Sequence, residues 1–217
     1  MSAVKTEIIT PREAAKRSDD GAFCPAFYWR SFPVVEKIRD LAGGGCCGDL
    51  RSLRFTASRP RKHAVDEASF VYDRFSAMLD GAGFLAGAPC RKLYIEKCAG
   101  ANNLFALAEF ENGVVAEFEA NECLPDTLPD IAFVKANFSA GHITNQPLVG
   151  YFNEEGLLYA DDSSCGQYIA DNALTSLAAG PFAWMESRFA LAVERGEIAL
   201  GKLGCDRWLS MIAEVLS

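Results

Sequence analysis

The sequence contains only two histidines, His63 and His142, and its eight cysteines include no C-x-x-C pair. Protein zinc sites draw on closely spaced cysteine and histidine ligands, so no metal centre is expected. The scattered cysteines do not indicate a disulfide scaffold either, because that signature belongs to short secreted chains. We expect most of these thiols to behave as small apolar side chains in a reducing compartment.

Secretory, membrane-spanning and strongly basic segments are also missing. The start, Met1-Ser-Ala-Val-Lys5, has no apolar stretch, and no apolar run approaches the roughly 20 residues that cross a bilayer. The net charge of −8 argues against nucleic acid as a partner, because proteins that bind phosphate backbones concentrate Lys and Arg on one face. The one dense basic run, residues 59–63 (RPRKH), is more typical of a solvated loop than of a binding patch. These features predict a cytoplasmic protein that binds neither membrane nor nucleic acid.

Helical signals occupy the beginning of the chain. Residues 10–13 (TPRE) have the cap and proline order of a helix N-terminus, and residues 32–42 repeat apolar side chains at helical spacing. The glycine-rich residues 43–48 (GGGCCG) follow this helix rather than a strand. They therefore predict a helix end and a turn, not a phosphate-binding loop.

The middle of the chain has the two-residue alternation of strands. Asn112-Gly113 is a strong hairpin signal, since both central positions of a two-residue hairpin turn need positive φ. The layout predicts an α+β fold with one open, mostly antiparallel β-sheet and helices packed on one face. The expected strands are residues 50–57, 92–99, 103–110, 114–121, 131–138, 143–149 and 157–160, and the further helices are residues 66–85, with weak points at Gly81 and Gly83, 167–178, 181–195 and 205–216.

Several segments carry a family resemblance through their order. They are FYWRSFPVVEKIRDLAGGGCCGDLRSLRF (27–55), LAGAP (85–89), LAEFENGVVAEFEA (107–120), and, near the end, ESRFALAVERGE and WLSMIAEVLS. In this order they resemble the C-terminal domain of the Gfo/Idh/MocA oxidoreductase family. The resemblance implies that residues 1–217 form one such domain, with residues 1–32 as a remnant of the family's inter-domain helix region. It also implies that the N-terminal dinucleotide-binding domain is lacking.

The family's catalytic helix is written Gly-Gly-Gly-x-x-x-Asp-x-x-x-His, in which the histidine moves a proton while hydride leaves for nicotinamide. Counted back from LAGAP, the family's aspartate falls on Asp73, its histidine on Ala77 and its glycines on residues 67–69 (EAS). Lys5 falls on the family's catalytic lysine, without the neighbouring Glu and Pro. The resemblance therefore makes Lys5 and Asp73 the catalytic candidates, although an alanine at position 77 cannot transfer a proton.

The resemblance also implies substrate-binding roles for Asp80 and Arg30, although Asp80 could instead cap or pair within the fold. Other groups could in principle supply the missing base. A buried carboxylate with a raised pKa could do so near Tyr72 and Asp73, and a loop histidine, His63 or His142, could fold towards the helix. We regard an ordinary solvated or structural role as the better prediction for both histidines.

Two hypotheses about function follow. The first is a pseudoenzyme that acts as a ligand-binding, regulatory or assembly module, expected to form a homo-oligomer through the open sheet face and to bind at most a small polar ligand. The second is the substrate-binding half of an NAD(P)-dependent sugar or polyol dehydrogenase, completed by a separate nucleotide-binding chain. No cofactor is expected for the isolated chain, because it has no Gly-rich strand-to-helix turn to hold a pyrophosphate.

Overall fold

The computed structural model describes residues 6–17, 22–45, 47–146, 157–161, 165–168 and 180–217. Within these residues the main sheet has eight strands in the order β10-β9-β8-β7-β3-β6-β5-β4, and β1 and β2 form a separate pair. The strands are β1 Glu7–Ile9, β2 Phe23–Pro25, β3 Leu50–Pro60, β4 Cys90–Lys97, β5 Asn103–Phe110, β6 Val115–Leu124, β7 Ile131–Phe138, β8 Gly141–Thr144, β9 Leu157–Asp161 and β10 Cys165–Tyr168.

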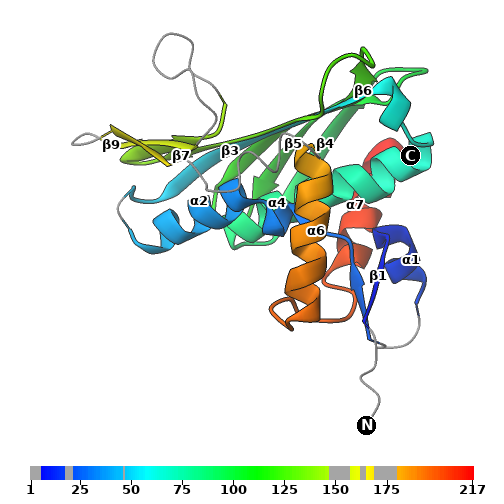
Figure 1. The fold of residues 1–217 in the computed structure, drawn as a ribbon, viewed down its shortest axis with the longest axis horizontal. Helices are drawn as coiled ribbons and strands as arrows, with labels where there is room; N and C mark the ends of the chain where they lie inside the picture. The colour runs from blue at the N-terminus through cyan, green and yellow to red at the C-terminus, as the bar shows by residue number, and fades with distance from the viewer. Residues whose placement is uncertain (1–5, 18–21, 46, 147–156, 162–164, 169–179) are drawn as a thin grey trace.

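The main sheet is mixed but mostly antiparallel. Strand β3 pairs in parallel with β6 on one side and antiparallel with β7 on the other, and every other neighbouring pair is antiparallel. Figure 1 shows the helices gathered on one face of this sheet, which confirms the predicted α+β class with an open sheet. The helices are α1 Pro11–Lys16, α2 Pro33–Gly43, α3 Glu67–Ser69, α4 Ser76–Ala86, α6 Pro181–Glu194 and α7 Cys205–Leu216, with 3-10 turns η1 Tyr28–Ser31 and η2 Arg61–His63 and the π-helical turn η3 Phe70–Phe75.

Aromatic side chains join the helices to the sheet. The ring of Trp29 lies edge-on to Phe55 of β3, with centroids 5.3 Å apart, and Phe55 stacks on Phe118 of β6 at 5.8 Å. All three side chains are fully buried. Such close packing of large rings fixes how the helical layer lies on the sheet.

The two glycines in α4 are packing sites rather than weak points. A Cβ at Gly81 would lie 2.8 Å from the Cβ of Trp29, and one at Gly83 would lie 2.9 Å from the indole of Trp208. Real Cβ contacts are not that short, so both positions need glycine for the tryptophans to approach the helix. Each glycine lowers the stability of the helix by about 1 kcal/mol relative to alanine, and the close approach of the two tryptophans requires this loss.

The N-terminal helix begins where the sequence predicts. Thr10 is the N-cap of α1, and Thr10 and Glu13 complete a capping box with Pro11 in the first turn. The strands on either side of α1, β1 and β2, were not predicted, because segments of three residues are too short to show an alternation. They pair in parallel, with Glu7 opposite Phe23 and Ile9 opposite Pro25.

Two predictions in the strand regions need correction. The hairpin between β5 and β6 is present, but its turn spans Glu111–Asn112–Gly113, and of these three residues only Gly113 has positive φ (84°). A three-residue loop needs only one such residue, so Asn112 is not forced into the left-handed region. Strand β8 ends at Thr144 rather than extending to 149, and residues 147–149 lie outside the described residues.

The helix expected over residues 167–178 is wrong at its start. Gln167 and Tyr168 pair antiparallel with Leu158 and Leu157 as part of β10. Residues 169–178 lie outside the described residues. The local apolar spacing is typical of a helix, whereas pairing with β9 determines the conformation of these two residues.

The helices in the described ranges include none that is both long and apolar enough to cross a membrane.

The described cysteines form two groups that differ in exposure. Cys24, Cys47, Cys90 and Cys205 are buried, as expected of small apolar side chains, whereas Cys98 and Cys123 are exposed. Burial raises the pKa of the Cys24 and Cys205 thiols to about 11, so neither is a reactive thiolate near neutral pH.

Candidate functional site

The helix predicted over residues 66–85, which the resemblance makes the counterpart of the family's catalytic helix, is present and runs through α3, η3 and α4. Asp66 is its N-cap, with Oδ1 accepting the Ser69 N–H at 2.9 Å. The π-helical turn η3 contains Asp73, and α4 contains Ala77 and Asp80. A π-helical turn within a helix often marks a functional site, because it changes which side chains share a face.

Asp73 is bound by an arginine from α1. The backbone N–H and Nε of Arg12 donate to its two carboxylate oxygens at 3.1 and 2.8 Å. Nη2 of the same arginine donates to Ser69 Oγ at 2.6 Å. Burial raises the pKa of Asp73 above its ordinary value, while the bonds from Arg12 lower it. Asp73, which the sequence predicts to face a substrate, therefore connects α1 to the catalytic helix through Arg12.

Asp80 and Arg30 form a bidentate ion pair. Nε and Nη2 of Arg30, from η1, each donate to one oxygen of Asp80 at 2.6 Å. Asp80 is almost completely buried, and the Arg30 guanidinium lies over the Phe84 ring at 5.3 Å. Burial raises the pKa of Asp80, opposed by the hydrogen bonds from Arg30. The two predicted substrate-binding residues thus form hydrogen bonds with one another. Pairing within the fold was the alternative that the sequence left open for Asp80.

Ala77 is part of the core. Its exposed fraction is 0%, and it belongs to the same buried cluster as Phe75 and Met78. A fully buried alanine therefore occupies the position that the family gives to its histidine. Asp73 and Asp80 are each held by an arginine from a different element, and Lys5 lies outside the described residues.

Neither histidine contacts these carboxylates among the hydrogen bonds of the described residues. His63 Nδ1 lies 3.1 Å from Asp130 Oδ1, at the end of η2. His142 is on strand β8 rather than on a turn, and its Nδ1 lies 2.8 Å from Asn137 Oδ1. Burial, together with the positive charge of Lys135, lowers the pKa of His142, so it is neutral near pH 7.

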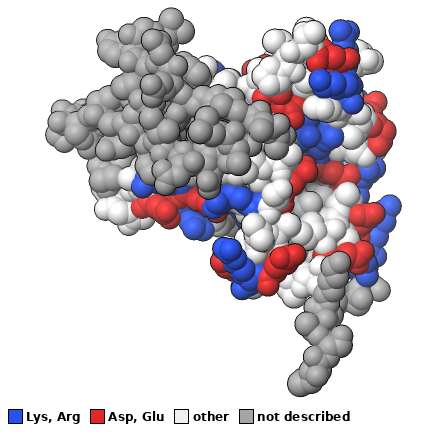
Figure 2. All heavy atoms as spheres, viewed as in Figure 1, with Lys and Arg blue, Asp and Glu red and all other residues white. Residues whose placement is uncertain are grey.

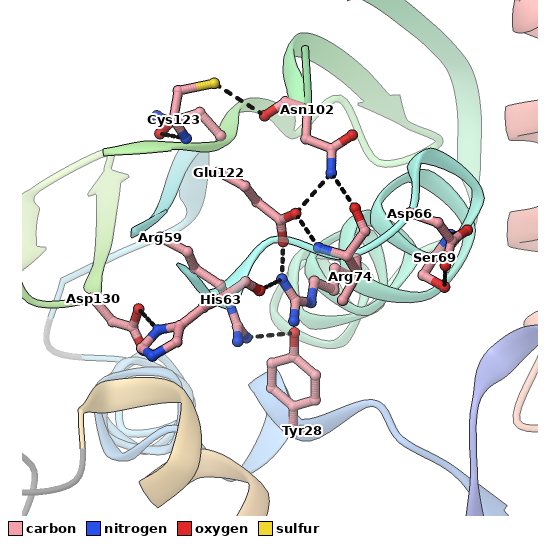
Figure 3. Close-up of polar contacts among 12 residues, drawn as sticks. Tyr28, Arg59, His63, Asp66, Ser69, Arg74, Asn102, Glu122, Cys123 and Asp130 are labelled. Carbon is pink, nitrogen blue, oxygen red and sulfur yellow. Dashed lines mark hydrogen bonds and ion pairs between the residues drawn. The ribbon is translucent and has the colours of Figure 1, made fainter. Parts of the chain in front are cut away.

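A polar cluster that the sequence did not predict lies between the ends of β3 and β6 and the catalytic helix (Figure 3). Its centre is Glu122, whose side chain is 1% exposed and whose carboxylate pairs with Arg74. The same carboxylate accepts the Val65 N–H at 2.9 Å and Asn102 Nδ2 at 2.8 Å. A fully bonded carboxylate of this kind holds the loop before the catalytic helix against β6.

Residues 59–63 were predicted to form a solvated loop, but Arg59 is not part of such a loop. The last three residues of that run, η2, are exposed, but Arg59 is only 9% exposed. Its guanidinium lies 3.7 Å from the centroid of the Phe182 ring and within 3.5 Å of the Tyr28 hydroxyl. β3 was predicted to end at residue 57, whereas it continues to Pro60 with a shift of register against β6 between Ser58 and Pro60, so Arg59 lies on the strand.

The charged surface is mixed where Figure 2 shows the described residues, with acidic and basic side chains interspersed and no broad basic area on that face. The described residues contain no group of three or more His, Cys, Asp or Glu side chains placed to hold a metal ion. The site is therefore a set of arginine–carboxylate pairs around one helix, beside a cavity whose lining includes Arg59 and Arg74.

Solved oxidoreductases share this fold. The chain aligns with UDP-N-acetylglucosamine 3-dehydrogenase from Acidithiobacillus ferrooxidans at a TM-score of 0.63 and 16% identity, over 90% of this chain and 60% of that chain. It aligns with an oxidoreductase from Agrobacterium radiobacter, in complex with NAD⁺, L-tartaric acid and magnesium, at a TM-score of 0.62 and 13% identity, over 88% of this chain and 60% of that chain.

An inositol dehydrogenase homologue from Azotobacter vinelandii, in complex with NADH and myo-inositol, aligns at a TM-score of 0.58 and 13% identity, over 89% of this chain and 62% of that one. The present chain thus spans about three fifths of these solved chains. Neither protein-family models nor curated proteins gave a match. At these identities the likeness establishes the fold, which is that of one part of these oxidoreductases.

Proposed function

We propose that this chain is a Gfo/Idh/MocA-like C-terminal domain that acts as a ligand-binding and assembly module without catalysis of its own. The shared fold supports the family assignment. Ala77 in the core, and Asp73 bound by Arg12, support the absence of a proton-transferring pair. Fold alone does not define activity, so the proposal depends on these side chains.

The observation that carries the assembly role is a row of exposed apolar side chains on the sheet face that no described helix covers (Figure 1). Tyr94 is 52% exposed, Phe105 49%, Leu107 47% and Val115 39%, and Tyr94 lies opposite Leu107 on neighbouring strands. Exposed apolar side chains grouped on an uncovered sheet face indicate an interaction surface. Glu96 and Glu119 lie opposite Phe105, and Glu109 lies opposite Val115, so acidic side chains border the group. The row is flanked by the exposed Arg54–Glu117 ion pair. A second copy of the same face would bury the row in a two-fold dimer.

Leu107→Arg tests this proposal. We expect light scattering to give a dimer or larger assembly for the native protein and a monomer for the variant, because two facing arginines would have to be buried at the dimer interface. Leu191→Arg is the matched control, since Leu191 is 48% exposed but lies on α6 in the helical layer. That variant should keep the native mass. A monomeric native protein at high micromolar concentration, or a Leu107→Arg variant of native mass, would refute the assembly role.

A second candidate function is favoured by the parallel pair β1–β2. The Glu7 N–H and the Ile9 carbonyl bond to residues flanking β2, at 2.9 Å each, so the Ile8 backbone groups point to the opposite edge. Among the described strands, β1 pairs only with β2. Parallel sheets are usually larger and covered on both faces. A dinucleotide-binding unit could add its parallel strands at this edge and supply NAD(P) to a substrate-binding half.

The second candidate predicts a gain of function on mixing. A neighbouring gene that encodes an isolated dinucleotide-binding domain would supply the partner, and mixing the two purified chains should give NAD(H) binding and polyol oxidation that neither chain gives alone. Calorimetry that finds no interaction between the two chains would remove the second candidate and leave the first.

A further inference from the structure

The cavity beside the catalytic helix is small and has donors on its walls. Its lining includes Tyr28, Trp29, Arg59, Arg74 and Phe182. Its volume is about 20 Å³, within a depression of about 260 Å³ that includes the mouth open to solvent. A volume of that size holds about one water molecule or one small polar group. Any larger ligand would have to leave most of its atoms in the mouth.

Arg59 is a nearly buried charge that forms no ion pair within the described residues. Its contacts there are the Phe182 ring and a long hydrogen bond to Tyr28 Oη. A guanidinium has five N–H donors, and burying a charge is costly unless it is paired. Its stacking on an aromatic ring offsets only part of that cost.

The neighbouring groups do not remove this imbalance. Figure 3 shows Arg59 and Arg74 approaching the Tyr28 hydroxyl together. Glu122, which also lines the cavity, already accepts bonds from Arg74, Val65 N–H and Asn102. Asp130, whose side chain is 9% exposed, lies 3.1 Å from His63 Nδ1. Burial and the positive charge of Arg59 lower the pKa of Arg74, while the negative charges of Glu186 and Asp130 oppose the shift.

Trp29, which also lines the cavity, has a buried indole N–H with no hydrogen-bond partner among the described residues. Buried donors in proteins are nearly always satisfied, so the polar bonding of this region is incomplete within the described residues. A water molecule in the cavity would not supply the negative charge that Arg59 lacks.

We propose that this cavity binds the carboxylate group of a small organic acid, with Arg59 as its principal partner and Tyr28 and Arg74 as further donors. A planar carboxylate matches the fork of a guanidinium, and one of its oxygens fits the inner volume of about 20 Å³. The rest of the acid occupies the mouth. This inference names the ligand class for the proposed binding role and in that respect rests on it, but it is independent of dimer formation.

Calorimetry and thermal denaturation with three probes at constant ionic strength test this proposal: acetate, L-tartrate and inorganic phosphate. We expect saturable binding of acetate and tartrate that raises the melting temperature of the native protein. Arg59→Met should weaken this binding about tenfold or more, since one charge-assisted pair is lost. Arg61→Met, in the exposed η2 turn, is the matched control and should bind as the native protein does.

Arg59→Met should melt at or above the native temperature in the absence of added anions, because it removes an uncompensated buried charge and keeps an apolar contact with Phe182. Should that variant fail to fold, Tyr28→Phe, which removes one donor and keeps the ring, must still weaken tartrate binding. Phosphate binding without carboxylate binding, no saturable binding of any probe, or unchanged affinity in the Arg59 and Tyr28 variants would each overturn the proposal. Light scattering on the same samples shows whether the assembly role stands or fails separately.

Discussion

Arg30→Met is expected to lower the free energy of unfolding at neutral pH by about 3–5 kcal/mol, the usual cost of leaving one member of a buried ion pair without its partner. The group left behind is Asp80, whose side chain is 2% exposed. Methionine keeps an apolar stem beside Phe84, so lost packing contributes little. Chemical denaturation of the native and variant proteins measures the difference.

The loss in Arg30→Met should depend on pH. Burial already raises the folded-state pKa of Asp80, and removing Arg30 raises it further. A carboxyl with a raised folded-state pKa contributes stability that is present at low pH and is lost as pH rises through the folded-state pKa. The deficit of the variant should therefore shrink as the pH falls from neutral towards the ordinary range of aspartate.

Two comparisons isolate the charge effect. Arg30→Met combined with Asp80→Asn leaves no buried charge, so it should recover part of the stability and lose the pH dependence. Arg54→Met breaks the exposed pair with Glu117, where both side chains are about half exposed, and should cost no more than about 1 kcal/mol. A single Arg30→Met variant as stable as the Arg54→Met control would show that the buried pair is not structural.

The second large effect is expected for Ala77→His, which places an imidazole at the family's histidine position. Because Ala77 is fully buried, the larger ring has to displace neighbouring side chains, and the free energy of unfolding should fall by about 1–3 kcal/mol. The polar ring adds a desolvation cost unless it finds partners. Thermal and denaturant unfolding report the change.

Ala183→His is the control for this substitution, because Ala183 is exposed on α6. It should change stability by about 0.5 kcal/mol or less. If Ala77→His were as stable as Ala183→His, an open space would have to exist beside position 77. The catalytic pocket of the family would then survive in this chain.

The long elements could be predicted from the sequence because each carries its own periodic pattern. The helix at 66–85 and the strands on either side of Asn112-Gly113 show their spacing over many residues, and the structure has them within a few residues of the expected limits. β1 and β2, with three residues each, contain too few residues to show a period, and their parallel pairing is long-range. Such short strands depend on tertiary contacts.

The positions of Asp73 and Asp80 on the helix could be predicted, but their partners could not. Arg12 reaches Asp73 across 61 residues of chain, and Arg30 reaches Asp80 across 50. Spacing along one helix carries no information about which residues of another element pack against it. The burial of Arg59 was missed for a related reason, since a basic run is usually solvated unless an adjacent strand carries its first residue into the core.

The most direct test of the central claim is a hydride-transfer assay on the purified chain with NAD⁺ or NADP⁺ and a panel of polyols and hydroxy acids. The claim is that the inherited catalytic position is filled by Ala77 and that Asp73 is engaged by Arg12. The account predicts no nicotinamide reduction above background by the native chain or by Ala77→His. Turnover by the native chain that Asp73→Asn abolishes would contradict the account.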